Sequence, residues 1–182
     1  MEHRPRTAVA RRPLYTPEQR ARRDATAWTL VQGVLAPVQF LVFLVSLGLV
    51  IRFLLTGEGY QLANLSIILK TGVLYLIMVT GAIWEQRVFG QYLFAPAFYW
   101  EDMVSMAVIA LHTAYLVCVV GGFGSTGLQL GIALAAYAIY VVNAGQFLWK
   151  FRLARLSEAA GAAHGERAPT QSTLTGTAGV SA

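Results

Sequence analysis

The sequence has little of what a soluble enzyme usually contains. Only 13% of its 182 residues are charged and 56% are hydrophobic, whereas a soluble domain carries about 25% charged residues. A single cysteine, Cys118, excludes an intrachain disulfide framework and makes iron–sulfur clusters and structural zinc unexpected. Of the three histidines only His112 lies in an apolar segment, so these segments cannot supply the two axial ligands of a bis-histidine haem.

Motifs of several enzyme classes are also missing. The sequence has no glycine-rich phosphate loop, no nucleophile elbow and no His-Glu-x-x-His zinc helix. It shows no internal repeat, and the lack of inverted-repeat symmetry argues weakly against a transporter.

Long apolar runs are what the sequence has instead. Each is near the roughly 20 residues that a helix needs to cross the hydrocarbon layer. None alternates with a period of two, and each is too long for a buried strand. A cleaved signal peptide is not expected, because the first run starts late and is too long. The runs predict an all-α, polytopic membrane protein with four transmembrane helices, at about residues 28–55, 62–84, 103–120 and 128–149.

The basic residues indicate the orientation of the chain. The net charge is +5, and eleven of the fourteen lysines and arginines lie in the two terminal segments. Four spans place both termini on one side, and the positive-inside rule predicts that this side is the cytoplasm. Topology and anionic lipid therefore account for the basic charge, and no nucleic-acid partner is expected.

Composition divides the chain into three parts. Residues 1–13 are predicted to be a disordered basic tail, residues 14–156 the four-helix transmembrane domain, and residues 157–182 a second disordered tail rich in Ala, Gly, Thr and Ser. Thr16, Pro17 and Gln19 have the pattern of an N-cap, a first-turn proline and a capping box. We therefore expect a short helix that starts there, before the first span, and that runs into this span.

The connection at about residues 85–102 is longer than the other two and is both aromatic and charged. Glu85, Glu101 and Asp102 lie at its edges, and carboxyls at a low-dielectric mouth are suited to proton transfer. The alternative is a surface cluster paired with Arg87. The aromatic side chains fit either an interfacial belt or a stacking wall for a large flat ligand; they are Phe89, Tyr92, Phe94, Phe98, Tyr99 and Trp100.

Polar side chains inside a span are costly, so each is a candidate for function unless it joins two helices. Gln32 and Gln39 share one face of the first span, because seven residues make about two helical turns. Asn143 and Gln146 share one face of the fourth span. Either pair could be interhelical hydrogen-bond partners or could contact a ligand.

His112 lies on one stripe of the third span with Glu101 and Ser105. It is about 16 Å from Glu101 along the helix axis. A satisfied structural histidine is one interpretation, and a ligand or acid–base group is the other. Lys70 and Lys150 are expected to snorkel toward the membrane surfaces.

The polar residues are unevenly distributed along the spans, since most of them fall in the cytoplasmic half. The distribution predicts a polar pocket that opens toward the cytoplasm, with His112 at its floor and the middle connection at its mouth. The residues predicted to contact a ligand there are Gln32, Gln39, Arg87, Tyr92, Phe98, Trp100, Ser105, Asn143 and Gln146.

Long and unusual strings carry a family resemblance. They are RPLYTPEQRARRDATAWTLVQGVLAPVQFLVFLVSLGLV, TGAIWEQRVFGQYLFAPAFYWEDMVSM, LHTAYL and AAYAIYVVNAGQFLWK, and they span about residues 12–155. The sequence resembles the 3-vinyl bacteriochlorophyllide hydratases, also called 2-vinyl bacteriochlorophyllide or chlorophyllide a hydratases. The resemblance implies a lyase that adds water to the C3 vinyl group of chlorophyllide a or a bacteriochlorophyllide. The product would carry a 1-hydroxyethyl group and lie on the route to bacteriochlorophyll.

The resemblance assigns no catalytic residues, so the predicted roles rest on the pattern above. Glu101 or Glu85 is predicted to protonate the vinyl group, with Asp102 in support, and a carboxylate or histidine to accept the proton of the attacking water. His112 is predicted to be an axial ligand to the magnesium of the substrate, and a general base is its competing role. No cofactor is expected, because the magnesium belongs to the substrate.

The alternative function is a non-catalytic membrane protein that binds pigment or scaffolds pigment enzymes. Such a protein would need aromatic residues and one axial histidine but no proton donor. The carboxyl cluster therefore distinguishes the hydratase from this non-catalytic alternative. The expected partners are the pigment substrate and the lipid bilayer, and further expectations are a homo-oligomer or contact with other pigment-synthesis enzymes. The expected location is the cytoplasmic or intracytoplasmic inner membrane of a photosynthetic bacterium.

Overall fold

The computed structural model describes residues 14–166, and these residues form helices without any strand. A short helix, α1 (Pro17–Ala25), precedes four long ones. These are α2 (Ala27–Thr56), α3 (Tyr60–Phe89), α4 (Tyr99–Gly121) and α5 (Thr126–Glu166). All four are long and apolar enough to cross a membrane, which confirms the predicted all-α membrane architecture. The cytoplasmic placement of both termini stays a prediction.

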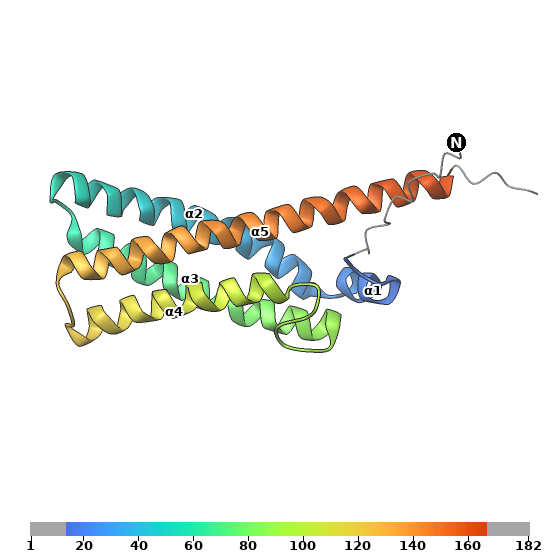
Figure 1. Ribbon diagram of the computed structural model, residues 1–182, viewed down its shortest axis with the longest axis horizontal. Coiled ribbons are helices and arrows are strands. Elements are labelled where there is room, and N and C mark those ends of the chain that lie inside the picture. The colour runs from blue at the N-terminus through green and yellow to red at the C-terminus, as the bar shows by residue number, and fades with distance from the viewer. Residues whose placement is uncertain (1–13, 167–182) are drawn as a thin grey trace, which may run out of the picture.

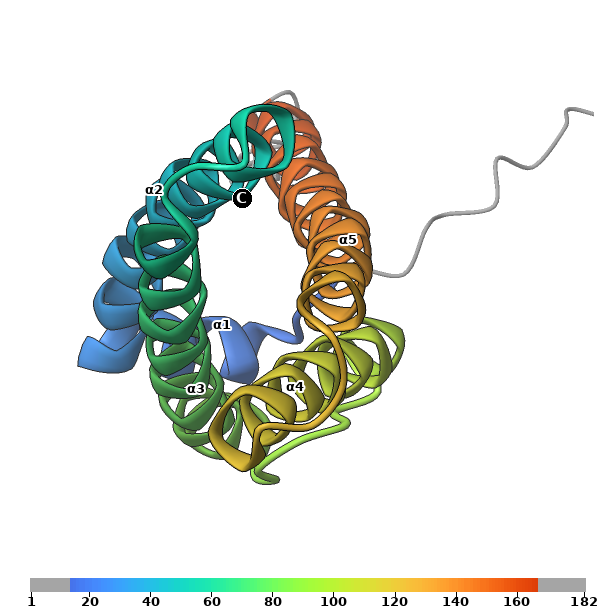
Figure 2. The ribbon, with the colours of Figure 1, turned by 90° about the vertical axis from the view of Figure 1, so that its left-hand side faces the viewer.

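The long helices form two hairpins, α2–α3 and α4–α5, that stand side by side. Viewed end-on, they follow one another around a ring in the order α2, α3, α4, α5 (Figure 2). The start of α2, the end of α5 and helix α1 lie together at one end of the molecule (Figure 1). We call this the terminal end, and we call the end with the α2–α3 and α4–α5 connections the loop end.

Helix α1 begins as the sequence predicts. The side chain of Thr16 accepts a hydrogen bond from the Gln19 N–H, and the side chain of Gln19 accepts one from the Thr16 N–H. The prediction that this helix continues into the first span is wrong. Thr26 has extended backbone, and its hydroxyl accepts a hydrogen bond from the Trp28 N–H, so it ends α1 and caps α2.

The loop-end connections are tight because glycines adopt left-handed backbone there. Gly57 and Gly59 have φ values of 73° and 83°, and Gly122 and Gly124 have 66° and 75°. This region is costly for residues with a Cβ atom and accessible to glycine. The short turns keep the two helices of each hairpin adjacent.

The outward faces of the helices are apolar, and polar side chains are directed inward. Leu55, Val120 and Leu148 are 81%, 85% and 73% exposed. Lys70 and Gln39, in contrast, are buried among the helices. This distribution suits a lipid bilayer, in which the outer surface of the bundle must be apolar and polar groups must find partners within the bundle.

Helices extend beyond the apolar runs at the terminal end. The middle connection is confined to residues 90–98, so Glu85 ends up on α3 while Glu101 and Asp102 lie in the first turn of α4. No helix forms within this connection. Helix α5 continues to Glu166, past the predicted domain end at residue 156, where an alanine-rich sequence favours helix. The other predicted tail residues, 1–13 and 167–182, lie outside the described residues.

Candidate functional site

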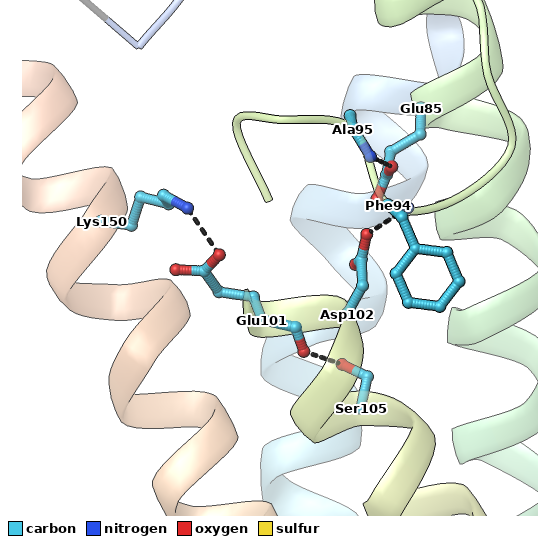
Figure 3. Close-up of polar contacts among 7 residues, drawn as sticks. All are labelled: Glu85, Phe94, Ala95, Glu101, Asp102, Ser105 and Lys150. Atoms are coloured by element: carbon cyan, nitrogen blue, oxygen red, sulfur yellow. Dashed lines mark hydrogen bonds and ion pairs between the residues drawn. The ribbon is translucent and has the colours of Figure 1, made fainter. Parts of the chain in front are cut away.

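Two of the predicted carboxyls bind the middle connection at the terminal end. The Phe94 N–H donates to Asp102 Oδ2 at 2.7 Å, and the Ala95 N–H donates to Glu85 Oε2 at 3.3 Å (Figure 3). Phe94 has a φ of 60°, and left-handed backbone within a turn lets successive N–H groups face one anion-binding side. Glu85 and Asp102 therefore both bind this loop, and they fix the connection to the ends of α3 and α4.

The third carboxyl, Glu101, points away from this loop toward α5 (Figure 3). Lys150 Nζ lies 2.5 Å from Glu101 Oε2 and 4.9 Å from the centre of the Phe98 ring. The side chains of Lys150 and Glu101 are 23% and 10% exposed. Lys150 is thus bound by a carboxylate near the terminal end and stays partly exposed, and its snorkelling to the surface stays a prediction.

A layer of amide side chains lies deeper between α2, α4 and α5. The rings of Phe43 and Tyr140 are 4.9 Å apart, which fixes the register of α2 against α5. One helical turn toward the terminal end, this register places Gln39 opposite Asn143. Asn143 donates a hydrogen bond to Ser105 Oγ at 2.7 Å.

Several polar atoms of this amide layer are buried without a hydrogen-bond partner among the described residues. They are both side-chain polar atoms of Gln39, and the amide oxygens of Asn143 and Gln146. Buried polar atoms nearly always have a partner in folded proteins. Gln39, Asn143 and Gln146 therefore present hydrogen-bonding capacity inside the bundle that a polar ligand group or water could use.

Lys70 and His112 meet deeper still, toward the loop end, and both are fully buried. Lys70 Nζ lies 2.7 Å from His112 Nε2, and His112 Nδ1 lies 2.8 Å from the carbonyl oxygen of Val108. The expectation that Lys70 snorkels outward is wrong. Its ammonium group lies 4.3, 5.1 and 5.9 Å from the ring centres of Tyr140, Tyr137 and Phe43.

The predicted aromatic wall is divided between interior and surface. Phe98 is 1% exposed and packs within 6.0 Å of the rings of Trp84, Phe89 and Phe147. Tyr92 and Trp100 are 63% and 71% exposed. These aromatic residues therefore do not form one continuous wall.

Two other residues predicted to contact a ligand lie outside the amide layer. Gln32 donates to Thr80 Oγ1 at 2.8 Å and so connects α2 with α3. Arg87 is exposed and, together with Arg22 of α1, lines an open cleft of about 390 Å³ at the terminal end. The structure thus places Gln39 opposite Asn143, which binds the predicted contact Ser105, but leaves Gln32 and Arg87 apart from them.

Comparison with known proteins identifies the family. A family model described as 2-vinyl bacteriochlorophyllide hydratase matches residues 15–153. The chain belongs to the 2-vinyl bacteriochlorophyllide hydratase family. A 2-vinyl bacteriochlorophyllide hydratase of Cereibacter sphaeroides is 70% identical over 149 residues, covering 82% of this chain and 92% of the relative. One of Rhodobacter capsulatus is 67% identical over 150 residues, covering 82% and 87%. No solved structure matches.

The site predicted from the sequence of this hydratase family member did not include Lys70 or the rings around it. One signal was available: Ala63, Ile67, Lys70 and Leu74 are spaced by three and four residues, and all four are buried. The signal is faint because the lipid-facing side of α3 is apolar too. A charged residue in the middle of a span is nevertheless a functional candidate by itself.

Proposed function

We propose that this protein is a lyase that adds water across the C3 vinyl group of chlorophyllide a or a bacteriochlorophyllide. The product is the 1-hydroxyethyl pigment, an intermediate of bacteriochlorophyll synthesis. The observation that carries the proposal is the 70% identity to a named hydratase over 92% of that relative's length. The match includes the helices that hold the interior polar groups.

The few unpartnered amide atoms in the interior of the bundle suit a substrate with few polar groups. The macrocycle is apolar and is taken up from the bilayer between the hairpins. Its propionate stays at the terminal end, where Arg22 and Arg87 line an open cleft. Arginine suits this role because its guanidinium group matches the geometry of a carboxylate. The amides of Gln39 and Asn143 then face the body of the pigment.

The reaction needs an acid and a base near one double bond. Protonation of the terminal vinyl carbon leaves a cation conjugated with the macrocycle, and water then attacks the inner carbon. The acids predicted from the sequence are Glu101 and Glu85, with Asp102 in support. Glu101 is bound by Lys150, and Glu85 accepts a backbone hydrogen bond, so each would have to exchange a contact to act.

The proposed reaction uses no added cofactor, since the magnesium is part of the substrate. An axial-ligand role for His112 requires Lys70 to leave His112 Nε2, because the other ring nitrogen is bonded to the Val108 carbonyl. We further propose an inner-membrane location in a photosynthetic bacterium, with both termini in the cytoplasm. Self-association and contacts with other pigment-synthesis enzymes belong to the same proposal.

The test is direct conversion of the pigment. The protein is purified in detergent and incubated with chlorophyllide a. The pigments are then separated by chromatography, and their masses are measured by mass spectrometry. We expect a product heavier than the substrate by one water, and no such product with heat-treated protein. Pigment that binds without any conversion would overturn the hydratase proposal and favour the pigment-binding alternative.

A further inference from the structure

All four long helices converge on the ammonium group of Lys70. Lys70 comes from α3, and its hydrogen-bond partner His112 comes from α4. The rings nearest to it come from α2 and α5, and they are those of Phe43, Tyr137 and Tyr140. The site therefore joins the two hairpins and is formed only in the complete bundle.

The contacts of His112 define how protons are arranged at this site. A carbonyl oxygen only accepts hydrogen bonds, so His112 Nδ1, at 2.8 Å from the Val108 oxygen, carries the imidazole proton. The other nitrogen, Nε2, then presents its lone pair to Lys70 Nζ at 2.7 Å. Lys70 is thus the donor of this bond, and its remaining N–H groups face the surrounding rings.

Among the described residues, no carboxylate forms an ion pair with Lys70. Tyrosine hydroxyls are the other titratable groups nearby, and that of Tyr137 is bonded to Ser46 Oγ at 2.6 Å. A charged group inside a membrane bundle is expensive and is a functional candidate by default. An apolar residue at position 70 would pack against the same rings without that cost, so packing does not account for the lysine.

We infer that Lys70 is the proton donor to the vinyl group of the pigment, and that His112 positions it. The inference rests on the proposed hydratase function and assigns a catalytic residue for it. His112 acts through Lys70, because it holds one N–H of the ammonium group and so orients the other two.

The chemistry balances without a further reactant. An N–H bond of the Lys70 ammonium breaks, and its proton forms a C–H bond with the terminal vinyl carbon at the expense of the π pair. The inner carbon becomes a cation, and Lys70 becomes an amine. The oxygen of a water molecule then bonds to the inner carbon, and the amine takes up the proton that this water releases. One water is consumed, and the ammonium group is restored.

The depth of the site fits the shape of the substrate. In chlorophyllide the propionate and the C3 vinyl group lie on neighbouring pyrrole rings, at separate positions along the edge of the macrocycle. A pigment that keeps its propionate at the terminal end can therefore tilt its vinyl-bearing ring inward, past the amide layer. Gln39 and Asn143 lie one helical turn from the rings of Phe43 and Tyr140, which adjoin Lys70. Glu101 is about 16 Å from His112 along α4, too far to serve the same double bond.

The first test compares Lys70→Gln with Lys70→Arg. Glutamine keeps a donor for His112 but has no transferable proton, whereas arginine keeps the charge and holds its protons firmly. Both variants are expected to bind chlorophyllide within a few-fold of the wild type and to lose at least about 100-fold in turnover of bound pigment. Binding is read from the pigment absorbance, and folding from circular dichroism.

Tyr75→Phe is the matched control. It removes another hydrogen bond between α3 and α4, at 2.7 Å to Thr113, which is adjacent to His112 in the chain. It is expected to keep wild-type turnover. Turnover within a few-fold of wild type in Lys70→Gln, or in Lys70→Arg if the glutamine variant fails to fold, would overturn the inference. An inactive wild-type protein would instead overturn the hydratase proposal itself.

A second measurement needs no variant at position 70, because the chain has only two lysines. Labelling with ¹⁵N-lysine gives two side-chain signals, and Lys150→Arg assigns them. Saturation with chlorophyllide is expected to shift the signal of Lys70 much more than that of Lys150. An unchanged Lys70 signal at saturation would show that the pigment does not reach it, and would overturn the inference without any variant at position 70.

Discussion

The two lysines of the chain occupy contrasting surroundings. Each lies over an aromatic ring and each donates one short hydrogen bond inside the bundle, but the acceptors differ. Lys150 is bound by the carboxylate of Glu101 near the terminal end and is partly exposed. Lys70 is bound by the neutral acceptor nitrogen of His112 and is fully buried. The first is a charge pair within reach of water, and the second is a cation without a described counterion.

This difference separates a lysine with a structural role from a lysine with a catalytic role. A partly exposed ion pair contributes little to stability and fixes local geometry. A buried cation without an anion is destabilising relative to a well-packed apolar residue. Lys150 therefore fits a structural role that orients Glu101, and Lys70 fits a role in catalysis.

Removal of the acceptor should be far more costly at the buried lysine. His112→Leu leaves the Lys70 ammonium without its hydrogen-bond acceptor and is expected to cost about 3–5 kcal/mol of unfolding free energy. Glu101→Leu leaves Lys150 able to reach water, with an expected cost of about 1 kcal/mol or less. Unfolding in detergent micelles, followed by circular dichroism, measures both.

The double variant Lys70→Met/His112→Leu sharpens this prediction. Replacing both partners by apolar groups is expected to return the stability to the wild-type level or above it. Equal costs for His112→Leu and Glu101→Leu, or no recovery in the double variant, would contradict the contrast between the two lysines.

The carboxyl cluster at the terminal end should show an intermediate effect. Asp102→Ala leaves the Phe94 N–H without its acceptor and is expected to cost about 1–3 kcal/mol. Because Glu85 still binds the next amide, the connection should stay near the helix ends. The measurement is unfolding as above, together with limited proteolysis of residues 90–98. Unchanged stability and unchanged cleavage would mean that these hydrogen bonds do not hold the connection.

Gln32 should give the smallest effect. Its hydrogen bond to Thr80 joins two helices of one hairpin, and such bonds in membrane proteins average about 0.6 kcal/mol. Gln32→Met is therefore expected to lower the unfolding free energy by about that amount and to leave pigment affinity unchanged. A clear loss of pigment affinity would instead support the sequence-based prediction that Gln32 contacts the substrate.

Local sequence signals predicted the elements well and predicted side-chain directions poorly. The capping box at Thr16 and Gln19 and the four apolar runs depend on neighbouring residues, so they could be read from the sequence. The break at Thr26 was missed, because a threonine between two helical segments does not by itself end a helix. Phe98 was predicted to contact a ligand, but rings from α3 and α5 bury it instead. These rings are distant in the sequence, so the burial could not be predicted from neighbouring residues.

The lysines show the same limit more sharply. Snorkelling is a sound expectation for a lysine near the end of a span when its neighbours are unknown. The direction of Lys70 depends on His112, which is 42 positions away in the sequence, and that of Lys150 depends on Glu101, 49 positions away. Partners brought together by tertiary packing decide both cases, and single-sequence periodicity does not contain that information.

The most direct test of Lys70 as the proton donor is turnover of bound pigment in Lys70→Gln and Glu101→Gln, measured side by side. Both variants are saturated with chlorophyllide a, and the rate of water addition is followed by chromatography. We expect a loss of at least about 100-fold in Lys70→Gln, the size typical of losing a general acid, and a loss below about 10-fold in Glu101→Gln. The reverse order would place the acid in the carboxyl cluster and would contradict a proton-donor role for Lys70.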